Sequence, residues 1–248
     1  MQYAPIFAFA FLVAFVYSSV GHGGASGYLA LLSFYAFPPA QMSASALALN
    51  VLVSSLAFYS FAKAGHFRWS STWPLIMFSI PAAFLGGMIK VSSSVYALTL
   101  AVILMYAGWR LWKGARAVPE NQALKSIPFG FAMLLGAGIG LVSGVVGIGG
   151  GIFLSPLLLF FRWANPKQAA ATSACFILVN SIAGLGGRIL QHHFEISGSP
   201  MLIVVILAAF GGGWLGSRMG ATHFSSAWLK RILALALFIA SIKLLITI

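Results

Sequence analysis

Long apolar segments, separated by short polar or glycine-rich stretches, make up almost the whole chain. A helix needs about 20 apolar residues to cross a bilayer, and eight segments reach or approach that length. The other two, 24–37 and 150–162, are shorter and predict half-helices. The ten predicted segments are 3–20, 24–37, 42–64, 73–90, 94–113, 127–146, 150–162, 167–190, 199–216 and 225–247.

Each short segment follows a cluster of glycines. The first cluster is Val-Gly-His-Gly-Gly at 20–24, and the second is Val-Gly-Ile-Gly-Gly-Gly at 146–151. Glycine is about 1 kcal/mol less favourable than alanine inside a helix, so both clusters predict helix breaks. A bilayer tolerates broken helices only where the freed backbone groups face protein or a water-filled cavity. We therefore expect the two breaks to meet near the membrane centre and to form one binding site.

Composition supports a multi-pass α-helical membrane protein. Hydrophobic residues account for 60% of the 248 residues and charged residues for 6%, against about 25% charged in soluble domains. The single Cys175 excludes an intramolecular disulfide. The first segment lacks a basic flank and an A-x-A site, so we expect a retained helix rather than a signal peptide. The basic residues sit singly at segment ends, which indicates topology signals and no nucleic-acid partner.

The glycine clusters belong to an internal duplication with an offset of 126 residues. We expect one integrated membrane domain, with a first repeat at 1–114, a cytoplasmic loop at 115–126 and a second repeat at 127–248. The matching pairs are Gly21 with Gly147, Gly23 with Gly149, Gly24 with Gly150, Pro74 with Pro200, Gly86 with Gly212 and Gly87 with Gly213.

The basic residues also predict how the repeats are oriented. If each half crosses the membrane an odd number of times, all Lys and Arg residues except Lys90, Arg188 and Lys243 lie on the cytoplasmic side. An even number would divide them almost equally, so the positive-inside rule favours inverted repeats. The predicted fold is all-α, with two inverted-topology repeats, each containing full spanning helices and a half-helix after a glycine-rich break. We expect it in the cell (inner) membrane with both termini outside.

The two glycine clusters, Ala-Ala-Thr-Ser at 170–173 and Gly-His-Phe-Arg-Trp at 65–69 resemble the TauE/SafE family of sulfite exporters and anion permeases. The resemblance covers nearly the whole chain. It implies export or uptake of small sulfur-containing anions such as sulfite or organosulfonates. The family often has an acidic residue where this chain has Arg68.

The breaks can supply an anion site. A half-helix that starts at a break points free N–H groups and a partial positive charge toward it, which suits an oxyanion. His22 is an asymmetric addition, since the second cluster has Ile148 there, and an ionisable residue inside a membrane suggests function. The alternatives are close helix packing by the glycines and a structural hydrogen bond from His22.

Polar residues in the following helices offer neutral donors, which suit an anion that must bind and leave; interhelical hydrogen bonding is the alternative. Substrate-binding candidates are Gly21, His22, Gly23, Gly24, Ser45, Asn50, Gly147, Gly149, Gly150, Gly151, Thr172, Ser173 and Asn180.

The function predicted is export of small sulfur-containing anions by alternating access, without cofactor, metal or enzymatic activity. No carboxylate lies in a predicted membrane centre, and the membrane potential itself favours anion export. One alternative is a passive channel or carrier for another small solute. A second is an intramembrane serine protease using Ser26, which lies in a Gly-Ala-Ser-Gly sequence at 24–27 and would need a histidine base. The substrate and oligomeric state stay open.

Overall fold

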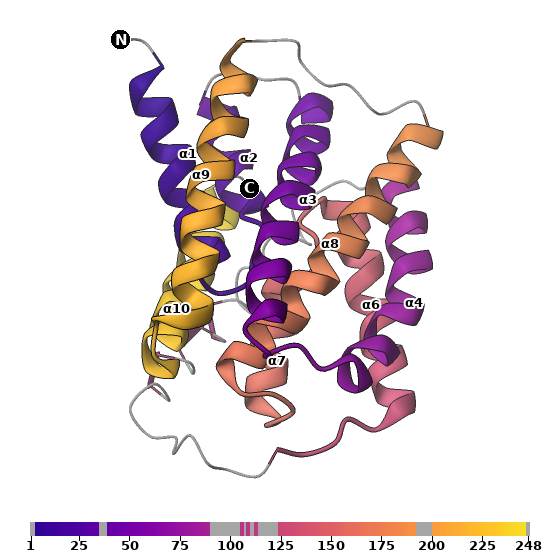
Figure 1. The fold of residues 1–248 in the computed structure, drawn as a ribbon. Helices are drawn as coiled ribbons and strands as arrows, with labels where there is room; N and C mark the ends of the chain where they lie inside the picture. Colours follow the sequence, from indigo (N-terminus) through magenta and orange to yellow (C-terminus); the bar gives the residue numbers. More distant parts are fainter. Residues whose placement is uncertain are drawn as a thin grey trace.

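The computed structural model describes residues 3–34, 39–89, 105–106, 108–109, 112–113, 124–191 and 200–246. Within these residues the regular secondary structure is helical (Figure 1). The helices are α1 (Ala4–Ser18), α2 (Ala25–Phe34), α3 (Pro39–Lys63), α4 (Trp69–Met88), α6 (Phe129–Val146), α7 (Gly151–Phe160), α8 (Pro166–Leu190), α9 (Pro200–Thr222) and α10 (Ser226–Ile246).

Helix lengths follow the apolar segments closely. Five helices of the described part are long and apolar enough to cross a membrane: the Ala44–Lys63 part of α3, with α4, α6, α8 and α9. The helix α1 has 15 residues, because the chain leaves the helix before the first glycine cluster. The predicted half-helices α2 and α7 have 10 residues each, which is too short to span. The predicted segment 94–113 lies mostly outside the described residues.

Helices from the two halves of the chain pack against each other through rows of glycines. In both rows the glycines are spaced one helical turn apart and lie against backbone carbonyls of the neighbouring helix. A Cβ atom at any of these glycines would overlap that carbonyl, so the close approach of the helices requires glycine. The rows are Gly136, Gly140 and Gly144 on α6, facing α4, and Gly212, Gly216 and Gly220 on α9, facing α1.

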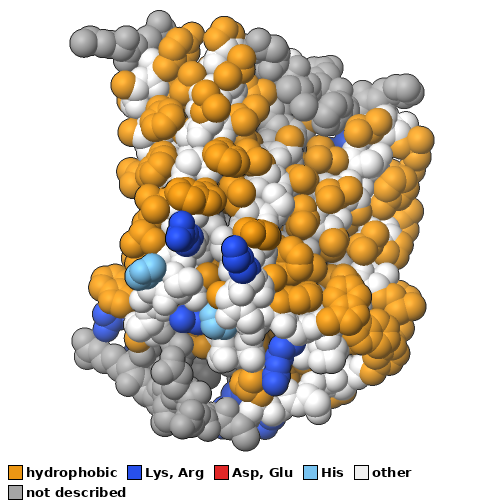
Figure 2. Space-filling view, in the orientation of Figure 1, with side chains coloured by type: hydrophobic (Ala, Val, Ile, Leu, Met, Phe, Trp, Pro, Cys, Tyr) orange, Lys and Arg blue, Asp and Glu red, His pale blue; other side chains and the backbone are white. Residues whose placement is uncertain are grey.

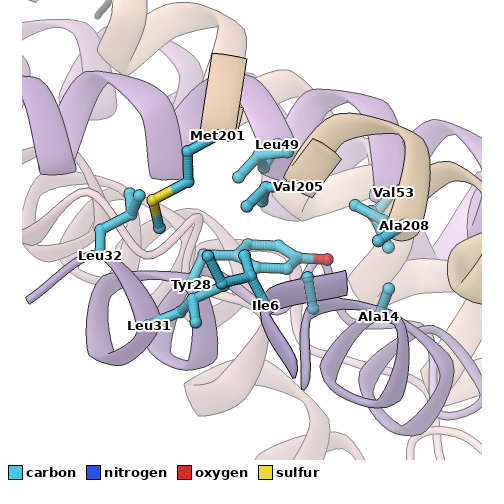
Figure 3. Packing of buried hydrophobic residues seen from close by; sticks show 12 residues of the cluster. Ile6, Ala14, Tyr28, Leu31, Leu32, Leu49, Val53, Met201, Val205 and Ala208 are labelled. Carbon is cyan, nitrogen blue, oxygen red and sulfur yellow. The ribbon is translucent and has the colours of Figure 1, made fainter. Parts of the chain in front are cut away.

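The half-helix α2 is held by an apolar cluster that joins α1, α2, α3 and α9. The ring of Tyr28 lies at its centre, with Leu49 and Val205 on one side (Figure 3). Tyr28 and Leu32 are fully buried. Burial of such large side chains compensates for the shortness of α2, which has few helical hydrogen bonds of its own.

On one face of the molecule, basic side chains gather toward one end. On the face shown in Figure 2, most Lys and Arg side chains lie in the lower part, whereas the upper part is largely apolar. Lys63 ends α3 and Arg68 precedes α4, and Figure 1 places the connection between these helices at that same lower end. We call it the basic end.

Candidate functional site

Both glycine clusters interrupt the helical path as the sequence predicts. After α1 the chain turns through residues 19–24 before α2 begins, and Gly21 and Gly24 have φ values of +78° and +88°. Between α6 and α7, Gly147, Gly149 and Gly150 have φ values of +78°, +81° and +79°. This left-handed region favours glycine because a Cβ atom would be strained there. We refer to residues 19–24 as the first break and to residues 147–150 as the second.

One side chain of α3 connects the two breaks. The Asn50 Oδ1 atom accepts a hydrogen bond from the backbone N–H of Ala25 (3.0 Å), at the start of α2. Its Nδ2 atom donates to the backbone carbonyl of Ile148 (3.0 Å), in the second break. Gly23 and Gly149 lie so close to the Asn50 amide that a Cβ atom on either would press on it. The two breaks therefore converge on Asn50.

His22 links the first break to the half-helix of the second. Its side chain is 2% exposed, and its Nε2 atom lies 3.0 Å from the Ser155 hydroxyl in α7. The Ser155 hydroxyl lies in turn 2.7 Å from that of Ser173 in α8. The Nδ1 atom of His22 has no hydrogen-bond partner among the described residues, although the backbone of Gly151 lies beside the ring.

Two small pockets lie on either side of this contact. His22 and Gly24 line the first pocket, which we call the central pocket. Ser155 lines the second, which we call the basal pocket. Residues from the first turns of α8 and α10 also line the basal pocket, so it lies toward the basic end. Each has room for about one water molecule. The central pocket is also lined by Tyr17, Gly23, Ala25, Ser26, Ile148, Ile152 and Ile177, and the basal pocket by Val20, Leu159, Pro166, Ala169, Ala170 and Leu229.

Ser26 is arranged differently from a protease nucleophile. Its hydroxyl oxygen lies 2.9 Å from the Tyr17 hydroxyl, and it is 7% exposed. The imidazole of His22 is engaged by Ser155 instead. A serine nucleophile needs a base within hydrogen-bond reach, so this pairing gives no support to the protease alternative.

Of the thirteen candidates from the sequence, His22, Gly23 and Gly24 line the central pocket, and the other ten, Asn50 included, line neither pocket. Three of these ten are polar residues away from the contacts of Asn50 and His22 described above. The Thr172 hydroxyl lies 3.3 Å from that of Thr72 in α4, and Asn180 accepts a hydrogen bond from Ser79 in α4 (2.9 Å). Ser45 is buried in α3, and its hydroxyl has no partner within the described residues. The first two contacts correspond to the interhelical alternative for these residues. The Asn180 Nδ2 atom is also without a partner in the described part of the chain.

The remaining glycine candidates shape the backbone. Gly21 packs directly against the backbone of Ala170. Gly147 caps the end of α6, where its N–H donates to the Ser143 carbonyl (2.8 Å). Gly150 begins α7 as its N-cap and lies against Phe176. These glycines therefore serve close packing as well as the breaks, and both interpretations from the sequence apply to them.

Sequence reasoning missed Ser155, which lies near the site. The counterpart of Ser155 in the first half, 126 residues earlier, is the apolar Leu29. Ser155 is therefore polar where its counterpart is apolar, as His22 is relative to Ile148. Comparison of the two halves, position by position, could have found it. The guanidinium of Arg188 donates to the carbonyls of Gly144 and Val145 (3.3 and 3.2 Å), where it stabilises the C-terminal end of α6.

Comparison with known proteins identifies the family. The family model described as sulfite exporter TauE/SafE matches residues 6–244. The probable membrane transporter protein y4hK of Sinorhizobium fredii is 35% identical over 240 residues, which cover 95% of each chain. The probable membrane transporter protein ORF9 of Sinorhizobium sp is 28% identical over 250 residues, which cover 98% of this chain and 90% of the relative. No solved structure gives a significant match. The chain therefore belongs to the sulfite exporter TauE/SafE family of membrane transporters.

Proposed function

We propose that this transporter carries small sulfur-containing oxyanions such as sulfite and binds them between the two breaks. The observation that carries the proposal is the bridge made by Asn50, which holds the start of α2 and the Ile148 carbonyl on one side chain. The buried imidazole of His22 lies beside the same breaks. A site so placed could be reached from either membrane face by modest movements of the two halves.

The chemistry around the breaks favours an anion. The half-helices α2 and α7 both start there, and the N-terminal end of a helix carries a partial positive charge. His22 adds an imidazole that can donate a hydrogen bond. The chain contains no Asp, and its two acids, Glu120 and Glu195, lie outside the described residues. An oxyanion at this site would therefore meet donors without a repelling carboxylate from the described part of the chain.

Two inverted repeats, 1–114 and 127–248, joined by a cytoplasmic loop at 115–126, form part of the proposal. In Figure 1, α1 descends from the N-terminus, whereas α6 rises from the opposite end, and α3 and α8 also run in opposite directions. The two glycine rows support the same relation, because each joins the first helix of one half to the fourth of the other. Rocking of one half against the other would expose the site to alternate sides.

Both pockets are smaller than an oxyanion, so in our proposal the site widens when the two halves move. The basic end faces the cytoplasm in our proposal, which places both termini outside the inner membrane. Moving one charge across 100 mV is worth about 2.3 kcal/mol, so a dianion gains roughly twice that on leaving a negative-inside cell. Export is therefore the favoured direction.

The test is binding of sulfite, thiosulfate, an organosulfonate and sulfate to the purified protein, followed by flux into proteoliposomes. We expect saturable, selective binding that Asn50→Ala weakens by about tenfold or more. We expect sulfite flux to follow the sign of an imposed potential. Ser217→Ala is the matched control, because Ser217 pairs with Ser60 between α3 and α9 and lines neither pocket.

The same binding and flux measurements distinguish the proposed transporter from a passive channel. A passive channel for another small solute would show flux that does not saturate and does not discriminate among the four anions. Absence of saturable binding for all of them would overturn the proposal. Indifference of the flux to the potential would overturn the direction alone.

A further inference from the structure

We propose that the hydrogen bond between His22 and Ser155 is the closed gate between the central pocket and the basal pocket. Ser155 would then be a residue on the transport path, with control over access from the basic end. This inference rests on the proposed function, since it gives the central site its connection to one membrane face.

The two partners of the bond belong to different pockets. His22 lines the central pocket and Ser155 lines the basal pocket, and the 3.0 Å contact between their side chains lies between the two. The backbone contact of Gly21 with Ala170 lies beside it and is too close to admit a Cβ atom. These two contacts separate the pockets together with apolar packing between Val20, which lines the basal pocket, and Ile152, which lines the central pocket.

Both contacts in this wall join the first half of the chain to the second. His22 and Gly21 belong to the first break, whereas Ser155 belongs to α7 and Ala170 to α8. Any movement of one half against the other must stretch them. The hydroxyl of Ser155 is also held by Ser173 of its own half, so the bond to His22 is the one that such a movement breaks.

The strength of the contact suits a gate. A neutral hydrogen bond contributes about 1 kcal/mol net, so thermal motion can open it often. When this hydrogen bond breaks, the Ser155 hydroxyl keeps its hydrogen bond with Ser173, and the His22 imidazole can turn toward the central pocket.

Cysteine labelling tests the gate without any substrate. In a Cys175→Ala background, Ala25→Cys places a thiol at the central pocket and Ala169→Cys places one at the basal pocket. A membrane-impermeant methanethiosulfonate reagent is then applied to each membrane face separately. From the basic end, we expect Ser155→Ala to speed labelling at position 25 by about fivefold and to leave position 169 unchanged. Ser155→Thr, which keeps the hydroxyl, should restore slow labelling at position 25.

The control is again Ser217→Ala, which removes another hydroxyl pair between the two halves and should change neither labelling rate. The gate is wrong if Ser155→Ala leaves labelling at position 25 unchanged, or if Ser217→Ala accelerates it equally. Faster labelling from the opposite face alone would also overturn it. Sulfite binding to the unmodified protein is measured independently, so a failed gate and a failed substrate assignment give different results.

Discussion

The first and second breaks share two left-handed glycines, although Gly149 also has a positive φ and its counterpart Gly23 does not, and their side chains differ. Gly21 and Gly147 share a φ of +78°, and Gly24 and Gly150, at +88° and +79°, also correspond at the 126-residue offset. The same turn chemistry therefore ends the first helix of each half and starts a half-helix. Because both breaks meet on Asn50, the two turns lie at one place in the molecule.

The side chains depart from this correspondence where the two halves touch. His22 has Ile148 as its counterpart, and Ser155 has Leu29. These two polar exceptions are hydrogen-bonded to each other across the halves. In our proposal, therefore, the duplicated glycine turns supply the cradle, whereas the polar chemistry of the site and its closure come from positions where the halves have diverged.

The largest loss of stability is expected from a methyl group added at Gly21, in the first break. Gly21→Ala places a Cβ against the backbone of Ala170, in addition to the strain of its φ. Gly65→Ala is the control, because Gly65 has nearly the same φ, +79°, and open space around it. We expect Gly65→Ala to cost about 1–2 kcal/mol and Gly21→Ala to lose the folded, monodisperse peak in size-exclusion chromatography after mild heating. Equal losses would show that packing at the first break does not matter.

Asn50 allows the two breaks to be compared in one variant, because its side chain is hydrogen-bonded to the start of α2 after the first break and to the second break. Asn50→Asp keeps an acceptor for the Ala25 N–H, loses the donor to Ile148 and adds repulsion for an anion. Sulfite affinity should fall by about tenfold or more in calorimetry. Asn180→Asp is the matched control, because it keeps its acceptor for Ser79 and loses a donor that has no partner in the described structure. If the two variants lose affinity equally, the site does not centre on Asn50.

His22→Ile gives the first break the side chain of the second. The backbone should tolerate it, because Ile148 occupies the corresponding position. Sulfite affinity should fall several-fold, by about 1 kcal/mol, because a buried donor is lost. Ile148→Val is the control, because it keeps the backbone carbonyl that Asn50 contacts and an apolar side chain at the central pocket. Unchanged affinity in His22→Ile, measured by the same calorimetric titration, would show that the polar exception has no part in binding.

The sequence indicated the helices and the breaks well, because both depend on local chemistry. Apolar length defines a spanning segment, and α6, α8 and α10 begin and end within a few residues of the predicted bounds. Clustered glycines in an apolar segment predict a break whatever surrounds them. The two half-helices followed from the same signal.

The orientation of side chains was harder to predict, because helices in a membrane are apolar on all faces and show little periodicity. Nothing in the sequence distinguishes Asn50, which reaches the breaks, from Asn180, which bonds to Ser79 in α4. The partners of Asn50 are backbone groups, which every residue type has, so the sequence does not reveal them. Ser155 was overlooked because only departures within the glycine clusters were compared.

The smallest effect is expected at Thr172, where sequence reasoning suggested a substrate ligand and the structure shows a 3.3 Å contact to the Thr72 hydroxyl. Thr172→Val keeps the shape and removes the hydroxyl. Hydrogen bonds between membrane helices average about 0.6 kcal/mol, so thermal stability in detergent should change little. Sulfite affinity should equal that of Thr72→Val, which removes the same contact together with a hydrogen bond from Thr72 to the Arg68 carbonyl. A selective loss of affinity in Thr172→Val would instead place Thr172 among the ligands and extend the site from the breaks toward α4.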